Sequence, residues 1–262
     1  MGTTKLIVGT ESGILVLERA DGSWRKSAGG LDGKFVEKLE LTPDGRLFAG
    51  LPRDGVYKAD GSPGSWRRIL EADVRGLAIS PHDPSVLFAG TEPASVFRSV
   101  DGGETWEELS AVKELPSVPQ WTFPAPPHQP HVRTFDFISG EPQTVLAGVE
   151  VGGVIRSQDG GETWEEIGEG IYEDVHYILA NPKSPDVVYS TTGAGFYRSL
   201  DRARTWEFTF EGISNFYTHP VVARPDAPEV VYVAAASGAP PSFSRPSGAE
   251  ALIFRSRDAG KS

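Results

Sequence analysis

Two residue types are almost missing from the chain: it has no cysteine and only one methionine. Without cysteine there can be no disulfide framework, no thiolate metal site and no thiol nucleophile. No apolar run approaches the roughly 20 residues that a membrane-spanning helix needs. The opening residues, MGTTKLIVGT, also lack the basic end and cleavage site of a secretory signal. We therefore expect a cytoplasmic protein with no membrane partner.

Positive charge is also scarce. The chain has 25 lysines and arginines against 36 acidic residues, for a formal net charge of -11. An acidic chain repels phosphate backbones, so nucleic acid is not an expected partner. Long stretches of helical periodicity are absent. Instead, 30 glycines and 21 prolines indicate many turns, and therefore many short strands.

What the chain does contain is an internal repeat. Tryptophans at positions 24, 66, 106, 164 and 206 each end a similar stretch: ERADGSW, KADGSPGSW, RSVDGGETW, RSQDGGETW and RSLDRARTW. A sixth copy, RSRDAGKS, begins at Arg255 and stops where its tryptophan is due. The sequence therefore predicts that the chain is truncated at its C-terminus, inside a repeat.

The segments before these motifs repeat as well. DVRGLAISPHDPSVLFAGTEPASVFRS aligns with DVHYILANPKSPDVVYSTTGAGFYRS, and both contain three apolar strands separated by turn residues. Four short strands in about 40 residues are typical of a propeller blade. The sequence predicts an all-β propeller of four-stranded antiparallel blades with six repeats visible, from a parent of six or seven blades. We assign a single domain, 1–262, with repeats at about 5–30, 35–70, 73–110, 131–168, 174–211 and 217–262. The first repeat lacks its innermost strand.

The repeated motif Ser-x-Asp-x-Gly-x-Thr-Trp is expected to close the hairpin between the third and fourth strands. Its aspartate can accept backbone N–H bonds, its glycines can adopt positive φ, and its tryptophan can pack as an apolar wedge between blades. Catalysis needs a single site, whereas this motif recurs in every repeat. We therefore assign the motif a structural role. The residues concerned are Asp101, Trp106, Asp159, Trp164, Asp201 and Trp206.

This motif resembles the Asp-box, or BNR repeat, of sialidases, sortilin-like receptors, xyloglucanases and photosystem assembly propellers. The resemblance implies a propeller fold, and the family holds enzymes, receptors and chaperones alike. Sialidases would further imply an Arg-Ile-Pro motif near the start, which this chain lacks. We therefore do not expect sialidase activity. We still expect a fold like that of glycosyl hydrolases.

Two insertions interrupt the rhythm of the repeats. Residues 112–130 lie between a fourth strand and the next first strand, and residues 236–250 lie between a second and a third strand. In a propeller both connections lie on the same face, opposite the Asp-box turns. The insertions carry Trp121, Phe123 and Phe243, so they are predicted to form either a lid over a site or an apolar plug.

The innermost strands are predicted to present polar side chains at the top of the central axis. The first residues of these five strands are Phe35, Asp73, His131, Asp174 and Tyr217. The third residues of the same strands are Glu37, Arg75, Arg133, His176 and His219. First and third positions of a strand share a face. Burying charge is costly unless it is paired. Two interpretations remain open: a polar ligand site, or a water-filled channel whose charges pair with one another.

Three chemistries fit such a ring. Arg75 and Arg133, with His131, His176, His219 and Tyr217, could hold an anion, a sugar or a peptide on which Trp121 stacks. His131, His176 and His219 or a carboxylate could hold a divalent metal, since zinc and iron accept histidine together with Asp or Glu. Glu37, Asp73 and Asp174 could supply the carboxylate pair of a glycosidase. We predict a binding or assembly module for a small polar or anionic ligand, with a glycoside hydrolase or metal-dependent hydrolase as the alternative.

Overall fold

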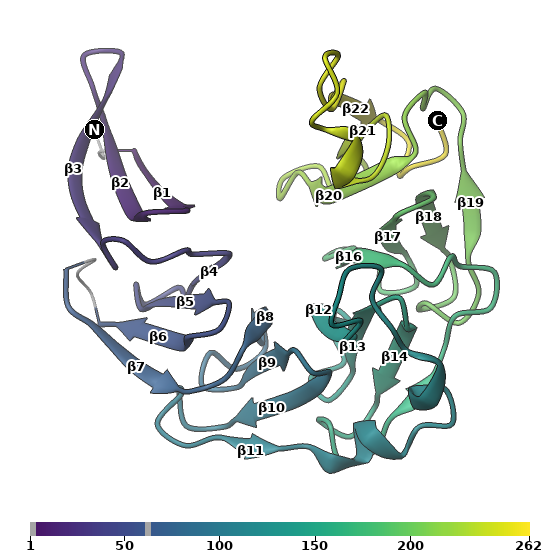
Figure 1. Ribbon diagram of the computed structural model, residues 1–262, viewed down its shortest axis with the longest axis horizontal. Helices are drawn as coiled ribbons and strands as arrows, with labels where there is room; N and C mark the ends of the chain where they lie inside the picture. The colour runs from purple at the N-terminus through teal and green to yellow at the C-terminus, as the bar shows by residue number, and fades with distance from the viewer. Residues whose placement is uncertain (1–3, 61–63) are drawn as a thin grey trace. The chain divides into compact units, whose positions relative to one another are not determined.

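The computed structural model describes residues 4–60 and 64–262. These residues form six antiparallel sheets of three or four strands (Figure 1). The helices found in this part of the chain are three short 3-10 turns, and none of them has the length or apolar character needed to cross a membrane. The chain separates into two compact units, Met1–Glu108 and Leu109–Ser262, which are described one at a time.

The first unit contains three sheets, each formed by consecutive strands. The first consists of β1 (Lys5–Thr10), β2 (Gly13–Ala20) and β3 (Ser23–Gly30). The second consists of β4 (Lys38–Leu41), β5 (Leu47–Leu51), β6 (Gly55–Ala59) and β7 (Trp66–Leu70). The third consists of β8 (Val74–Ile79), β9 (Leu87–Thr91), β10 (Ser95–Ser99) and β11 (Glu107–Glu108).

The second unit also contains three sheets. The first consists of β12 (His131–Phe137), β13 (Val145–Glu150), β14 (Gly153–Ser157) and β15 (Glu165–Glu166). The second consists of β16 (Val175–Ala180), β17 (Val188–Thr192), β18 (Gly195–Ser199) and β19 (Glu207–Thr209). The third consists of β20 (Tyr217–Ala223), β21 (Val231–Ala236) and β22 (Leu252–Ser256). The first insertion holds η1 (Ser110–Glu114) and η2 (Val118–Gln120), and the second holds η3 (Pro240–Ser242). The first strands β12, β16 and β20 are neighbours (Figure 1).

Each sheet coincides with one repeat of the sequence, which confirms the all-β propeller of antiparallel blades. The first sheet has three strands, consistent with a first repeat that lacks its innermost strand. The assignment of 1–262 to a single domain stays a prediction. Residues 61–63, in the second tryptophan motif, lie outside the described residues.

The Asp boxes close the turns between third and fourth strands, as predicted. In the box before β15, Asp159 accepts hydrogen bonds from the Thr163 backbone N–H at 2.9 Å, the Thr163 hydroxyl at 2.6 Å and the Ser157 hydroxyl at 2.8 Å. The loss of some hydrating water opposes ionisation of Asp159, but these hydrogen bonds outweigh it and lower its pKa to about 2. The same bonds recur at Asp101, Asp201 and Asp258.

The box before β19 has lost its glycines to Arg202 and Ala203 but keeps the backbone shape of the other boxes. Arg202 and Ala203 have φ values of 62° and 65°, close to the positive φ of the glycines in the other boxes. The Ala203 N–H still donates to the Ser199 hydroxyl at 2.9 Å. The hydrogen bonds to Ser199 and Asp201 therefore hold a left-handed turn that the side chains themselves disfavour.

The box tryptophans pack as wedges between neighbouring sheets. Trp206 is 6% exposed, in a cluster with Ile138 and Leu146 of the preceding repeat. Trp66 and Trp106 also pack into clusters that span two adjacent sheets. Trp164 lies immediately before β15 rather than within it. Where a tryptophan packs in this way, adjacent sheets bury apolar surface that a single blade would expose, whereas Trp24 of the first repeat is 45% exposed.

Candidate functional site

A cavity of about 550 Å³ lies in the second unit, where the first strands of its sheets meet the two insertions. Its apolar lining comes from the insertions: Phe123, Pro124 and Ala125 from the first, and Ala239, Pro240 and Pro241 from the second. Its polar lining comes from the sheets: Arg133, Glu150, Asp174, Tyr217 and His219. Ligand sites in proteins have this size and this mixture of apolar walls with a few convergent polar groups.

β-Bulges set the direction of the polar side chains. The ladder of β12 skips between Val132 and Thr134, so Arg133 is the unpaired residue. The ladder of β16 skips in the same way, leaving His176 unpaired. A bulge bends its strand and redirects a side chain, and bulges occur often beside functional sites. Simple alternation along the strand, which the sequence prediction used, does not describe these positions.

Glu150 is the centre of a buried charged cluster. Its Oε2 lies 2.8 Å from His131 Nε2 and also accepts a hydrogen bond from Arg133. Burial opposes ionisation of Glu150, but the hydrogen bond from His131 and the positive charge of Arg133 outweigh it and lower its pKa to about 2. Arg133 is therefore already engaged by a carboxylate, and Glu150 is held in its ionised form.

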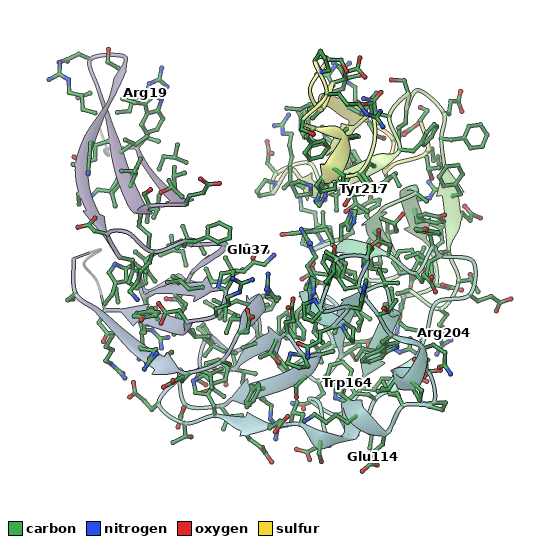
Figure 2. All side chains as sticks on the ribbon, viewed as in Figure 1. Arg19, Glu37, Glu114, Trp164, Arg204 and Tyr217 are labelled. Atoms are coloured by element: carbon green, nitrogen blue, oxygen red, sulfur yellow. The ribbon has the colours of Figure 1, made fainter. Side chains whose placement is uncertain are left out.

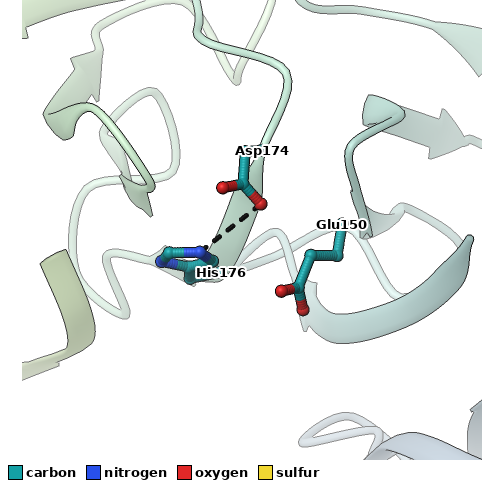
Figure 3. A group of neighbouring side chains, drawn as sticks. All are labelled: Glu150, Asp174 and His176. Atoms are coloured by element: carbon teal, nitrogen blue, oxygen red, sulfur yellow. Dashed lines mark ion pairs between the residues drawn. The ribbon is translucent and has the colours of Figure 1, made fainter. Parts of the chain in front are cut away.

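Asp174 and His176 form a second pair beside Glu150 (Figure 3). His176 Nε2 lies 3.4 Å from Asp174 Oδ1, and the His176 side chain is 1% exposed. One ligand atom from each of Glu150, Asp174 and His176 lies within 4.8 Å of the other two. The three side chains thus have a spacing at which a metal ion can be held.

Three of the predicted residues, His176, Tyr217 and His219, form an aromatic stack. The His176 and His219 rings lie parallel, with centroids 4.2 Å apart and an interplanar angle of 7°. Tyr217 packs against both rings. Burial, together with the negative charges of Asp174 and Glu150, raises the pKa of Tyr217 to about 12, so its hydroxyl remains a hydrogen-bond donor. Figure 2 places Tyr217 at the start of β20.

The structure brings together only part of the metal set suggested by the sequence, and it uses carboxylates in place of two of the histidines. His131 is directed at Glu150, and His219 is stacked on His176 instead of facing the same point. Of the three histidines, His176 alone belongs to the cluster with metal-binding spacing. Its partners there are two carboxylates.

The first unit has its own charged cluster. Arg75 Nε lies 3.0 Å from Asp73 Oδ1, and its Nη2 lies 3.1 Å from Glu92 Oε2. Asp73 also accepts the backbone N–H of Arg53. Here the charges pair with one another, as in the second interpretation of the sequence. Glu37 lies just before β4 and pairs with Lys38 at 3.8 Å.

The aromatic side chain that lines the cavity from the first insertion is Phe123, whereas Trp121 is buried beneath it. Trp121 is 8% exposed, and its indole N–H donates to the Ser117 hydroxyl at 2.7 Å. Phe123 packs against His131 with ring centroids 5.0 Å apart. From the second insertion, Phe243 packs edge-on against Tyr217, with ring centroids 6.4 Å apart.

Sequence reasoning missed Glu150, which ends the second strand β13, and Glu92, which immediately follows the second strand β9. A signal was present, because the stretches FAGTE and LAGVE end the second strands of two consecutive repeats. In the ladder, His131 pairs directly with Glu150. An acidic residue at the end of a second strand therefore faces the start of the first strand.

Comparison with known proteins agrees with this architecture. Residues 155–166 match the BNR/Asp-box repeat. No curated protein matches the chain. Among solved structures, a GH74 enzyme of Niastella koreensis has a TM-score of 0.64 at 18% identity over 85% of this chain and 35% of its own. The GH74 xyloglucanase of Xanthomonas campestris has a TM-score of 0.54 at 16% identity, over 87% of this chain and 44% of its own. YCF48 of Cyanidioschyzon merolae has a TM-score of 0.59 at 15% identity, over 100% of this chain and 85% of its own.

These likenesses concern the fold. The chain covers little more than a third of the Niastella enzyme and less than half of the Xanthomonas enzyme. The repeated boxes, the six antiparallel sheets and the structural neighbours agree with one another. The chain is a BNR-type β-propeller.

Proposed function

We propose that this chain is a binding module that holds a small polyhydroxylated ligand, such as a short sugar chain, in the cavity of the second unit. The observation that carries the proposal is the cavity itself: about 550 Å³, with a polar floor and apolar walls from both insertions. The insertions act as walls around a site and not as a plug that fills it.

The charges of the floor favour a ligand rich in hydrogen-bond donors over an anion. The lining has two acidic side chains, Glu150 and Asp174, against the single arginine Arg133. That arginine is already bound to Glu150. A free carboxylate or phosphate would have to displace Glu150 and would also be repelled by Asp174. Sugar hydroxyls can instead donate to the carboxylate oxygens, while Phe123 offers an apolar face to the ring.

Ligand binding can be tested by thermal unfolding with a panel of neutral oligosaccharides, including xyloglucan fragments, and of organic anions such as citrate. At ten times its Kd, a ligand stabilises the folded chain by about 1.4 kcal/mol. For a chain of this size, that corresponds to a rise in Tm of roughly 3–5 °C. We expect this rise with a neutral sugar and none with citrate. A rise with the anions alone would refute the assignment.

Two variants connect any shift to the cavity. Phe123→Ala and Asp174→Asn remove one apolar wall and one acceptor, and each should weaken sugar binding. The matched control is Glu92→Gln, which alters the charged cluster of the first unit. If the sugar-induced shift survives in Phe123→Ala and Asp174→Asn as fully as in Glu92→Gln, the ligand does not bind in this cavity.

A glycoside hydrolase is the second candidate, because the oxygens of Glu150 and Asp174 approach within 4.8 Å. Retaining glycosidases hold their two carboxyl groups about 5–5.5 Å apart. Glu150 is ionised, so it would have to serve as the nucleophile and Asp174 as the proton donor. Chromatography of xyloglucan oligosaccharides after incubation with the protein separates the two candidates. Intact sugar that still raises the Tm supports the binding module, whereas cleavage that is lost in Glu150→Gln supports the hydrolase.

A further inference from the structure

His176 is oriented as a metal-binding histidine. Its Nδ1 lies 2.7 Å from the backbone carbonyl oxygen of Thr218. A carbonyl oxygen can only accept, so Nδ1 must carry the proton. In the neutral ring, Nε2 therefore presents a lone pair. This N–H···O=C contact is the arrangement that fixes the tautomer and direction of metal-bound imidazoles.

The lone pair of His176 faces a carboxylate. Nε2 lies 3.4 Å from Asp174 Oδ1, and neither atom has a hydrogen-bond partner among the residues that the structure describes. Two buried acceptors facing one another repel unless a positive charge lies between them, which either a proton on Nε2 or a metal ion can supply. A metal ion bound to both atoms would remove that repulsion.

We propose that Glu150, Asp174 and His176 bind a divalent transition metal, with Zn²⁺ the best fit. Zinc accepts one imidazole and two carboxylates as ligands at about 2.0–2.2 Å, whereas Mg²⁺ and Ca²⁺ prefer oxygen ligands alone. Two tetrahedral ligands at such distances lie about 3.3–3.5 Å apart. The separation of 3.4 Å between His176 Nε2 and Asp174 Oδ1 already matches this spacing.

Glu150 and Asp174 come from neighbouring sheets: Glu150 ends β13, and Asp174 immediately precedes β16. The hydrogen bonds of the Glu150 carboxylate with His131 and Arg133 both use Oε2, so Oε1 is the oxygen offered to a metal. Gly193 makes room for Asp174, because a Cβ at that position would lie 2.2 Å from Asp174 Oδ2. Glu150 and Asp174 line the cavity, so a fourth ligand of the metal would come from there.

This inference goes beyond the proposed function, because the metal site would stand even if no sugar bound. The sugar and citrate tests above therefore apply to the metal-free chain, in which Glu150 and Asp174 keep their negative charges uncompensated by a metal. The test is isothermal titration of the metal-free chain with Zn²⁺, and with Mg²⁺ as the oxygen-preferring control. We expect one Zn²⁺ per chain and no saturable Mg²⁺ binding. His176→Ala should weaken Zn²⁺ binding by more than about 100-fold, since it removes the only nitrogen ligand.

A second variant guards against loss of fold. Gly193→Ala keeps all three ligands and has a permitted backbone conformation, but its methyl group displaces the Asp174 carboxylate. We expect it to unfold at the wild-type temperature and to bind Zn²⁺ about 10–100-fold more weakly. Glu92→Gln, in the charged cluster of the first unit, should stay within about twofold of wild type. Absence of one-to-one Zn²⁺ binding, or equal affinities in wild type, His176→Ala and Gly193→Ala, would overturn the proposal.

Discussion

The Asp box provides a stability prediction that depends on pH. The substitution Asp159→Asn keeps an acceptor for the Thr163 backbone N–H but replaces the oxygen that accepts the Thr163 hydroxyl. It also removes the negative charge. The folded chain lowers the pKa of Asp159 from the ordinary 3.8 to about 2. The native box therefore favours the ionised form over the protonated form.

The size of the effect follows from that shift. A difference of roughly 1.8 pKa units corresponds to about 2.4 kcal/mol. Asp159 is exposed, however, and solvent screening reduces this to about 1 kcal/mol. Because the folded pKa is lowered, the contribution is complete above about pH 4 and is lost as the pH falls through about 2.

Urea unfolding of wild type and Asp159→Asn at a series of pH values measures the effect. Wild type should be more stable by about 1 kcal/mol at pH 7, and the difference should shrink as the pH falls from about 4 through about 2. Carboxyl NMR titration of Asp159 in the folded chain should place its pKa near 2. A stability difference that does not change with pH, or a native pKa near 3.8, would refute the reasoning about the box.

Two further predictions concern the packing of the blades. Trp206 is 6% exposed between sheets, so Trp206→Ala should cost about 3–5 kcal/mol in urea unfolding, whereas Trp24→Ala, at a position 45% exposed, should cost less than about 1 kcal/mol. Similar costs for both would contradict the wedge. Gly55 has a φ of 133°, and a Cβ there would lie 1.9 Å from the Leu70 carbonyl oxygen. Gly55→Ala should therefore lower the free energy of unfolding by at least about 2 kcal/mol. The control is Gly22→Ala, where φ is 78° and no atom lies within 4 Å of the added Cβ, and it should cost about 1 kcal/mol. Equal losses in the two variants would argue against the close contact at Gly55.

The fold could be predicted from the sequence because its determinants are local and repeated. A box such as SQDGGETW contains both the acceptor and the donors of its own hydrogen bonds, so Asp159 finds Thr163 without help from distant residues. The alternation of apolar and turn residues then sets four strands per repeat. The convergence of the two insertions on one cavity also followed, since both connections lie on the same face of a propeller.

The details of the site could not be predicted, because they depend on departures from regular strands and on contacts between repeats. Bulges at Arg133 and His176 break the alternation that the prediction assumed. Glu150 enters from a second strand, and Trp121 turns inward to reach Ser117. A single sequence indicates which polar residues lie near the axis, but not which of them neutralise one another.

The most direct test of the binding site is a titration of the ¹⁵N-labelled chain with the sugar that gives the largest thermal shift, monitored by amide chemical shifts. We predict saturable changes concentrated around Phe123, Arg133, Tyr217 and the second insertion, all of which lie at the cavity. Changes confined to the charged cluster around Arg75 and Glu92, or scattered over both units, would contradict the assignment of this cavity as the site.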